Sequence, residues 1–267
     1  MTAQREQTER LKVILTHDID WPPKGPGLAH VLARKDRFEA YIIQKSMDEG
    51  FNPYNNIRRL MDIEDKLDVK STFFFRPRYD DGTPVSSYTD TMRELRQGGW
   101  EVGAHLNDAN SFQSIKSERD SIASAVGQPP AGCRVHYLRI AEGSHSFMSR
   151  AGFSYDSSLM FTKDRIDIRN SGCLKKNGLV VFPITIMDTY LFTYMKVPEE
   201  RIIEIFDEAI STCKDRTYMT VLWHDSSLMM KGGRLYEKVC EMLATRADVE
   251  VVTAGQGYLS ASAGGIN

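Results

Sequence analysis

The sequence predicts an α/β protein whose parallel strands curl into an irregular (β/α) barrel. Apolar, β-branched runs of strand length alternate with segments of helical periodicity along most of the 267 residues. Several of these runs end in ionisable residues, as expected where the carboxyl ends of parallel strands share one functional rim. No linker or internal repeat divides the chain. We therefore expect one domain over residues 1–267, with its core at about 11–257.

The first expected strand is the apolar run at 13–15, which ends in the motif Thr-His-Asp-Ile-Asp (16–20). Asp18 and Asp20 lie two residues apart, so on an extended strand both side chains would point to the same side. Two carboxylates on one side repel each other unless a cation or a proton lies between them. The alternative is a turn or N-cap cluster, in which Asp is common.

The remaining elements follow from the same patterns. The prolines and glycines of residues 21–27 predict a loop. Further strands are expected at 69–75, 100–106, 133–138, 153–158, 180–186, 218–223 and 249–252. Helices are expected at 53–67, 87–97, 114–126, 147–151, 199–212 and 234–245. The small, polar residues 260–267 are expected to be frayed.

Composition excludes several classes of function. The formal net charge is −2 and no lysine–arginine block occurs, so nothing in the charge pattern favours nucleic acid or anionic lipid as a partner. No apolar stretch reaches membrane-spanning length, and residues 1–10 lack the apolar segment of a signal peptide. The four cysteines lie far apart, which is typical of reduced, structural thiols. These observations predict a cytoplasmic protein.

Ionisable residues follow the ends of several expected strands. Besides Asp18 and Asp20, these are His105, the run Arg-Val-His-Tyr (134–137), Asp156 and His224. In a parallel barrel they would meet at one mouth.

Six motifs in this order resemble the polysaccharide deacetylase superfamily, in a divergent branch with Asp-x-Asp in the first motif. They are Thr-His-Asp-Ile-Asp, Ser-Thr-Phe-Phe-Phe, Glu-Val-Gly-Ala-His, Arg-Val-His-Tyr, Tyr-Asp-Ser-Ser and Leu-Trp-His. The resemblance runs from about residue 11 to about 257. It implies a barrel of about seven β/α units, a divalent metal ion, usually zinc, and hydrolysis of the amide of an N-acylated sugar.

By this resemblance Asp18 is the general base, and Asp20 and His105 are metal ligands. The second histidine of the family's metal motif would fall at Ala109, which cannot bind a metal. Catalytic zinc generally has three protein ligands. We therefore take Asn110 as the third ligand, with Asp108, His136 and His17 as alternatives. An oxygen-rich site would also suit manganese.

The resemblance assigns the remaining roles as well. Arg134 pairs with the base Asp18, His224 is the general acid, and Asp156 orients His224. The backbone N–H of Tyr137 is a candidate oxyanion donor, and His136 replaces a proline of the family. Trp21, His136, Tyr137 and Trp223 are the expected substrate-binding residues, with ordinary packing as the alternative for both tryptophans.

The sequence therefore predicts a metal-dependent amide hydrolase. Its expected substrate is an N-acylated amino sugar, or a sugar precursor, in surface polysaccharide or lipopolysaccharide biosynthesis. Two alternatives stay open: a catalytically silent, carbohydrate-binding homologue, and a different sugar-modifying reaction on the same scaffold.

Overall fold

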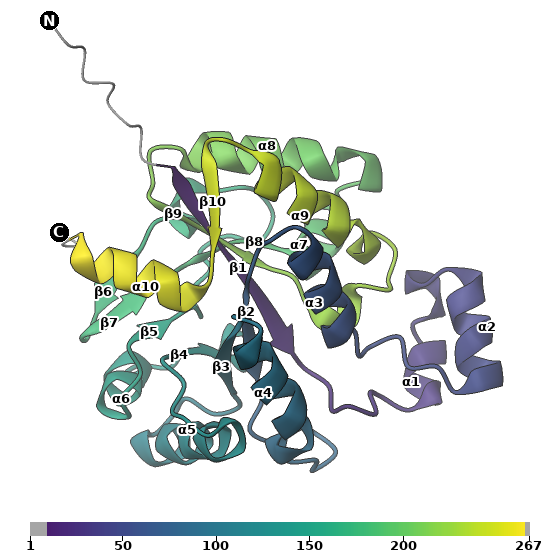
Figure 1. Cartoon of the computed structure of the whole chain (residues 1–267), viewed down its shortest axis with the longest axis horizontal. Coiled ribbons are helices and arrows are strands. Elements are labelled where there is room, and N and C mark those ends of the chain that lie inside the picture. Colours follow the sequence, from purple (N-terminus) through teal and green to yellow (C-terminus); the bar gives the residue numbers. More distant parts are fainter. Residues whose placement is uncertain (1–9, 265–267) are drawn as a thin grey trace, which may run out of the picture.

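A computed structural model of the chain describes residues 10–264 as a curled sheet of ten strands covered by helices (Figure 1). The strands are β1 (Leu11–Ile19), β2 (Thr72–Phe75), β3 (Glu101–Leu106), β4 (Gly132–Val135), β5 (Tyr155–Asp156), β6 (Leu174–Lys176), β7 (Leu179–Val181), β8 (Ile184–Met187), β9 (Tyr218–Leu222) and β10 (Val249–Val252). Their order is β6-β7-β5-β4-β3-β2-β1-β9-β8, with β10 beside β1. Only β6 is antiparallel to its neighbour within the part that the structure describes. The predicted mostly parallel, barrel-like α/β fold is confirmed, as a half-barrel.

The strand β1 lies at the centre of this sheet. One of its edges pairs with β9 along Lys12–Thr16. The other edge pairs first with β10, along Leu11–Ile14, and then with β2, along Thr16–Ile19. All but one of the nine residues of β1 are buried. A strand buried on both faces reads as a continuous apolar run, which is the pattern seen at 13–15.

Helices pack around the sheet. The α-helices are α1 (Leu28–Leu32), α2 (Ala40–Glu49), α3 (Ile57–Lys66), α4 (Thr89–Gln97), α5 (Phe112–Val126), α6 (Ser144–Arg150), α7 (Asp188–Thr193), α8 (Ile202–Cys213), α9 (Tyr236–Thr245) and α10 (Ala254–Ala263). The short 3-10 helices are η1 (Lys35–Arg37), η2 (Val85–Tyr88), η3 (His136–Leu138), η4 (Ile168–Asn170), η5 (Glu199–Arg201), η6 (Asp225–Ser227) and η7 (Gly233–Leu235). Among residues 10–264, no helix is long and apolar enough to cross a membrane.

Two expectations for individual elements are wrong. The run 180–186 is not one strand, because Pro183 has no N–H to donate and the chain breaks there into β7 and β8. The two pieces pair with different neighbours, β5 and β9. Residues 260–263 are not frayed but belong to α10, whose start is fixed by a capping box between Thr253 and Gln256. Residues 265–267 lie outside the described part.

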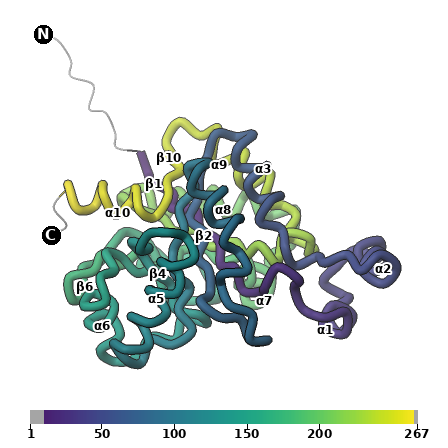
Figure 2. The backbone as a smooth tube through the Cα atoms, turned by 60° about the horizontal axis from the view of Figure 1, so that its bottom comes forward, coloured from purple at the N-terminus to yellow at the C-terminus, as the bar shows by residue number. Residues whose placement is uncertain are grey.

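An insertion between β1 and α3 was not predicted. It contains α1, η1 and α2, which project from one end of the barrel in both views (Figures 1 and 2). A small apolar cluster of its own holds it together, formed by Val31, Phe38, Ile42 and Tyr54. A β-bridge joins Phe38 to Met230, in the loop after β9. The insertion is therefore fixed beside that loop.

Candidate active site

The carboxyl ends of four strands bring most of the expected site residues into one cavity. Asp18 and Asp20 lie at the end of β1, and His105 lies near the end of β3. His136 directly follows β4, and His224 follows β9 after one residue. All five line a cavity of about 300 Å³. Adjacent parallel strands end together, so these side chains meet although they are far apart in the chain.

Asp20, His105 and His136 present three ligand atoms to one another. Asp20 Oδ1 lies 3.3 Å from His105 Nε2 and 3.3 Å from His136 Nδ1. The two histidine nitrogens are 3.1 Å apart. His105 Nδ1 lies 3.0 Å from the carbonyl oxygen of Arg134, which can only accept, so Nδ1 carries a proton and Nε2 is the ring nitrogen that can offer a lone pair to the cluster. Lone pairs and a carboxylate oxygen facing one another are stable only around a cation or a proton.

This cluster fits a divalent metal ion. Within residues 10–264, Asp20 Oδ1 is buried without a hydrogen-bond partner, which suits a metal-ligand atom. Burial raises the pKa of Asp20, but the neighbouring imidazoles of His105, His136 and His224 outweigh it and lower the pKa well below its usual value. Ligand atoms that share a tetrahedral ion at about 2.0 to 2.1 Å are about 3.3 Å apart, close to the spacing seen here. Two imidazoles and one carboxylate suit zinc and other ions that accept nitrogen and oxygen.

His136, one of the alternatives for the third ligand, is therefore the residue that the structure places in the cluster. Asn110 lies outside it, because its side chain is exposed and its Nδ2 donates to Asp108 Oδ1 at 2.6 Å. His17 is also outside, since its side chain points to the other face of β1, where its Nε2 lies 2.7 Å from Glu64.

Asp18 is held by Arg134, the residue expected to pair with it. Arg134 Nη1 donates to Asp18 Oδ1 at 2.8 Å. The same guanidinium is fully buried and also donates to Thr16 Oγ1 and to Ser157, so its position is fixed. Burial raises the pKa of Asp18, but Arg134, His105 and His224 together lower it below its ordinary value. Asp18 is therefore an oriented carboxylate.

His224 is paired with Asp188, which the sequence did not point to. His224 Nδ1 lies 2.7 Å from Asp188 Oδ1, and the His224 backbone N–H donates to Asp188 Oδ2 at 2.9 Å. Burial lowers the pKa of His224, but the carboxylates of Asp188, Asp20 and Asp18 outweigh it and raise the pKa to about 10. His224 is therefore an imidazolium whose Nε2 lies 3.7 Å from Asp20 Oδ2.

Asp156, expected to orient His224, lies elsewhere. It belongs to β5, several strands from β9 in the sheet, whereas Asp188 directly follows β8, the neighbour of β9. The Asp156 carboxylate is fully buried and lies 3.3 Å from His145 Nε2. The signal for Asp188 was available, since an ionisable residue again follows an expected strand, here 180–186, but none of the six motifs of the resemblance includes it.

The expected aromatic residues divide into two groups. Trp21 and Tyr137 line the cavity, and the Tyr137 ring lies 3.9 Å from the ring of His136. Tyr137 and Leu138 both have left-handed backbone angles, with φ of 56° and 55°, which is strained for bulky residues and common at functional sites. Trp223 is fully buried and its Nε1 donates to the carbonyl oxygen of Gly233, so it packs in the core and cannot reach a substrate.

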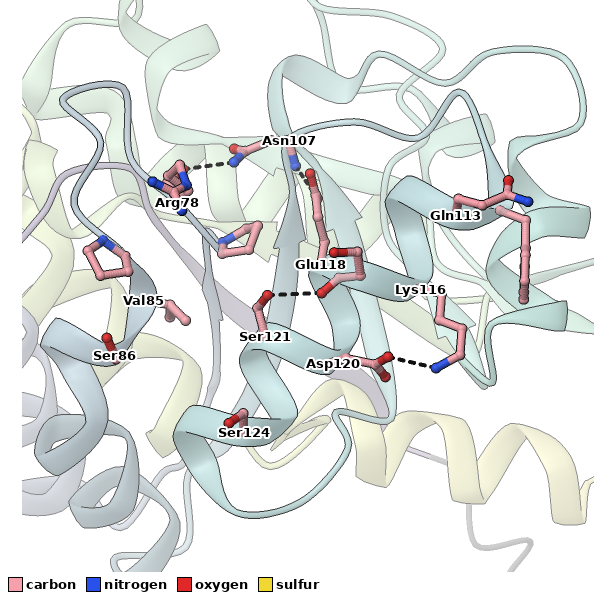
Figure 3. A pocket seen from close by; sticks show the side chains of 14 residues that line it. Arg78, Val85, Ser86, Asn107, Gln113, Lys116, Glu118, Asp120, Ser121 and Ser124 are labelled. Carbon is pink, nitrogen blue, oxygen red and sulfur yellow. Dashed lines mark hydrogen bonds and ion pairs between the residues drawn. The ribbon is translucent and has the colours of Figure 1, made fainter.

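A second cavity, of about 920 Å³, lies between η2 and α5 and contains none of the expected site residues (Figure 3). In it Glu118 accepts a hydrogen bond from the backbone of Asn107, and burial raises the pKa of Glu118 to about 7. Arg76 connects Asn107 to the site, because its guanidinium donates to Asn107 Oδ1 at 2.7 Å and to the carbonyl oxygen of Asp20 at 3.5 Å.

Comparison with known proteins finds the same fold in others. No protein-family model matches the chain. A chitin deacetylase from Colletotrichum lindemuthianum is 22% identical over 193 residues, which is 67% of this chain and 77% of that protein. The crystal structure of a Mycobacterium smegmatis protein assigned as a polysaccharide deacetylase superposes with a TM-score of 0.70 at 18% identity, over 98% of this chain and 93% of that one.

A third protein with a similar fold is named for a different activity. The 4-alpha-glucanotransferase from Thermococcus litoralis superposes with a TM-score of 0.59 at 15% identity, over 95% of this chain but 40% of that one. Identities this low establish the shared fold and no more. The resemblance inferred from the six sequence motifs is confirmed at that level.

Proposed function

We propose that this chain, which has the fold of the polysaccharide deacetylases, is a metal-dependent hydrolase that removes an N-acyl group from an amino sugar. The observation that carries the proposal is the convergence of three groups in one cavity. They are the Asp20, His105 and His136 cluster, the Asp18 carboxylate held by Arg134, and the His224 imidazolium. Together they match the needs of amide hydrolysis: an activated water, a polarised carbonyl and a proton for the leaving amine.

The cluster of Asp20, His105 and His136 would hold the metal. A divalent ion there would polarise the acyl carbonyl and lower the pKa of a nearby water molecule. Asp18 is ionised and fixed, so it accepts the proton that the attacking water loses. Arg134 keeps the Asp18 carboxylate in one orientation, so its oxygens point the same way in every catalytic cycle.

His224 supplies the proton that the leaving nitrogen needs. Its Nδ1 is held by Asp188, so Nε2 is the nitrogen that faces the cavity. The resulting dyad fixes both the protonation and the orientation of the ring. Asp18 and His224 thus divide the proton transfers, one as base and one as acid.

The sugar is part of the proposal. The relative named above is a chitin deacetylase, and Trp21 and Tyr137 offer aromatic faces at the cavity. The cavity volume lies at the low end of the range for small-molecule sites. Zinc as the metal, a precursor of surface polysaccharide or lipopolysaccharide as the substrate, and a cytoplasmic location are finer parts of the same proposal.

A silent homologue is less well supported. That alternative rested on Ala109 at the position of a metal histidine, and His136 from the next strand supplies the missing imidazole. A different reaction on the same scaffold is favoured only by the shared fold of the 4-alpha-glucanotransferase.

The test is release of acetate or formate from N-acetyl- and N-formylglucosamine by the zinc-loaded chain. We expect Asp18→Asn and His224→Ala each to lower kcat/KM by roughly 10²- to 10⁴-fold, as loss of a general base or acid does. Asn110→Ala is the matched control, exposed and outside the cluster, and should leave the rate unchanged. Equal rates in wild type, Asp18→Asn and His224→Ala would refute the proposed roles. Failure to release acid from any N-acylated sugar would refute the function.

A further inference from the structure

One wall of the active-site cavity carries two arginines that have no acidic partner. Arg34 and Arg37, from the insertion after β1, both line the cavity. Within residues 10–264 neither guanidinium forms an ion pair. Arg34 Nη1 lies 3.2 Å from His30 Nδ1, which must accept because a guanidinium can only donate. Burial and the nearby charges of Arg34 and Arg37 lower the pKa of His30, so His30 stays neutral and does not compete as a cation.

A second chamber of about 200 Å³ adjoins this cavity at Arg37. The two chambers share Arg37, Thr189, Ser227 and Met230 in their walls. Lys231 lies in the second chamber, and its ammonium donates only to the carbonyl oxygen of Asp36, at 3.1 Å. Its charge also acts on nearby Glu199, but within residues 10–264 that carboxylate forms its ion pair with Arg234, so Lys231 extends the basic wall away from the metal cluster.

The carboxylates that line the two chambers do not balance these cations. Asp18 is paired with Arg134, and Asp188 is paired with His224. Asp20 belongs to the metal cluster. Among the described residues, Arg34, Arg37 and Lys231 thus stay outside the ion pairs that the neighbouring Glu39 and Glu199 form with Arg234, although the chain as a whole has a formal net charge of −2. A cleft lined by one sign of charge concentrates ligands of the opposite sign.

The basic wall is held in place before any ligand binds. The backbone of Phe38 forms an antiparallel bridge with Met230, and the Lys231 N–H donates to the Arg37 carbonyl oxygen at 2.8 Å. These bonds connect the insertion to the loop that follows His224, and Figure 2 shows how the insertion stands away from the barrel otherwise. A backbone fixed in this way places Arg34 and Arg37 at the cavity without further ordering of the chain when an anion binds.

We propose that the substrate of the hydrolase carries a phosphate group, as a sugar phosphate or diphosphate ester, and that Arg34 and Arg37 bind its oxygens. This inference rests on the proposed function, because that proposal supplies the N-acylated sugar that bears the phosphate. The fork of an arginine matches phosphate oxygens, and three cations suit the charge of a diphosphate better than that of one carboxylate. The acylated sugar occupies the chamber with the metal cluster, and the phosphate lies toward Arg37 and Lys231.

Binding tests this without relying on catalysis. Inorganic pyrophosphate is titrated into the metal-loaded full chain by calorimetry. We expect the double variant Arg34→Ala/Arg37→Ala to raise the Kd at least about tenfold, since each lost charged hydrogen bond costs roughly that factor. Arg216→Ala is the control, because Arg216 is exposed and lines neither chamber. Pyrophosphate binding that is the same in the double variant and in wild type would overturn the inference.

Kinetics identifies the source of the phosphate. Acid release is compared for N-acetylglucosamine, its 1-phosphate, a nucleotide diphosphate ester, a short prenyl diphosphate ester and an N-acetylated amino uronate. We expect the ratio of kcat/KM for the phosphorylated over the plain sugar to exceed about ten, and to fall at least about tenfold in the double variant. The diphosphate ester with the higher kcat/KM identifies the carrier as a nucleotide or a lipid.

The two proposals fail in different ways. Hydrolysis with no preference for phosphate, or a preference for the uronate, would overturn the phosphate inference and leave the hydrolase standing. Pyrophosphate binding through Arg34 and Arg37 without hydrolysis of any ester would refute the hydrolase and leave the anion site.

Discussion

His17 and Asp18 are neighbours on β1, yet their side chains enter two different polar clusters. His17 points toward the helices, where its Nδ1 lies 2.6 Å from the Trp223 carbonyl oxygen and its Nε2 lies 2.7 Å from Glu64. Glu64 is fully buried and also accepts hydrogen bonds from Ser71, Trp100 and Tyr236. Every polar group that this cluster buries is satisfied by another of its members or by the backbone.

The cluster on the other face of β1 is incomplete. In the part of the chain that the structure describes, Asp20 Oδ1 and His136 Nε2 are buried without a hydrogen-bond partner, and the cluster opens into a cavity. Both clusters combine histidine and carboxylate side chains, and both are built around β1. The difference is whether every buried polar group has a hydrogen-bond partner. A saturated cluster, in which all of them do, stabilises the fold, whereas an unsaturated cluster that faces a cavity is suited to binding a ligand.

The largest effect on stability is therefore expected in the saturated cluster. Glu64→Gln removes the charge and turns one acceptor into a donor that faces other donors. We expect this substitution to lower the free energy of unfolding by about 3 to 5 kcal/mol, as breaking a buried charged pair does. Urea unfolding of wild type and variant measures the change.

The matched substitution in the unsaturated cluster is Asp20→Asn. It removes both the repulsion between Asp20 and Asp18 and the attraction between Asp20 and the His224 imidazolium, so we expect a loss of stability of no more than about 1 kcal/mol in chelator-treated protein. A large loss for Asp20→Asn, or none for Glu64→Gln, would contradict the division into structural and ligand-binding clusters.

The next effect concerns the His224 and Asp188 pair. Asp188 raises the pKa of His224, so in Asp188→Asn the acid form of His224 is lost at a lower pH. We expect kcat to fall by roughly 10²-fold and the alkaline limb of the pH–rate profile to move toward neutral pH. Asp156→Asn is the comparison, and an equal displacement of its alkaline limb would reassign the orienting role.

A further effect, away from the active site, is expected at Glu118 in the cavity of Figure 3, where burial is partial. Its folded pKa is about 7, above the ordinary value of 4.5, so the folded protein binds the extra proton and the associated stability is lost as pH rises from about 4.5 through 7. We expect Glu118→Gln to be more stable than wild type by about 1 to 2 kcal/mol at pH 8 and equally stable at pH 4. Thermal unfolding at the two pH values checks this difference, and a pH-independent difference would refute the cause.

Much of the fold and of the candidate site follows from local patterns in the sequence. Apolar runs that end in ionisable residues located the ends of β1, β3 and β9, because buried parallel strands and their polar carboxyl ends both leave a local signal. Asp18, Asp20, His105 and His224 were found in this way. The core position of Trp223 was also within reach, since residues 223 and 224 point to opposite sides of an extended chain.

The rest depends on tertiary structure. Asp188 was missed because its place beside His224 depends on the pairing of β8 with β9, which no motif in the sequence indicates. His136 reaches the cluster through a strained turn after β4, and the hydrophobic periodicity of the sequence does not predict such a turn. Arg34 and Arg37 come from an insertion whose place is set by its contacts with the loop after β9. None of these relations is local in the chain.

The central claim is that Asp20, His105 and His136 form the metal site, and zinc titration of the chelator-treated full chain by calorimetry tests it most directly. We predict one ion per chain in wild type and in Asn110→Ala. In Asp20→Ala and His136→Ala the affinity should fall by more than the roughly 10- to 100-fold that loss of an outer-shell partner costs. Wild-type affinity in His136→Ala, or lost affinity in Asn110→Ala, would contradict the claim.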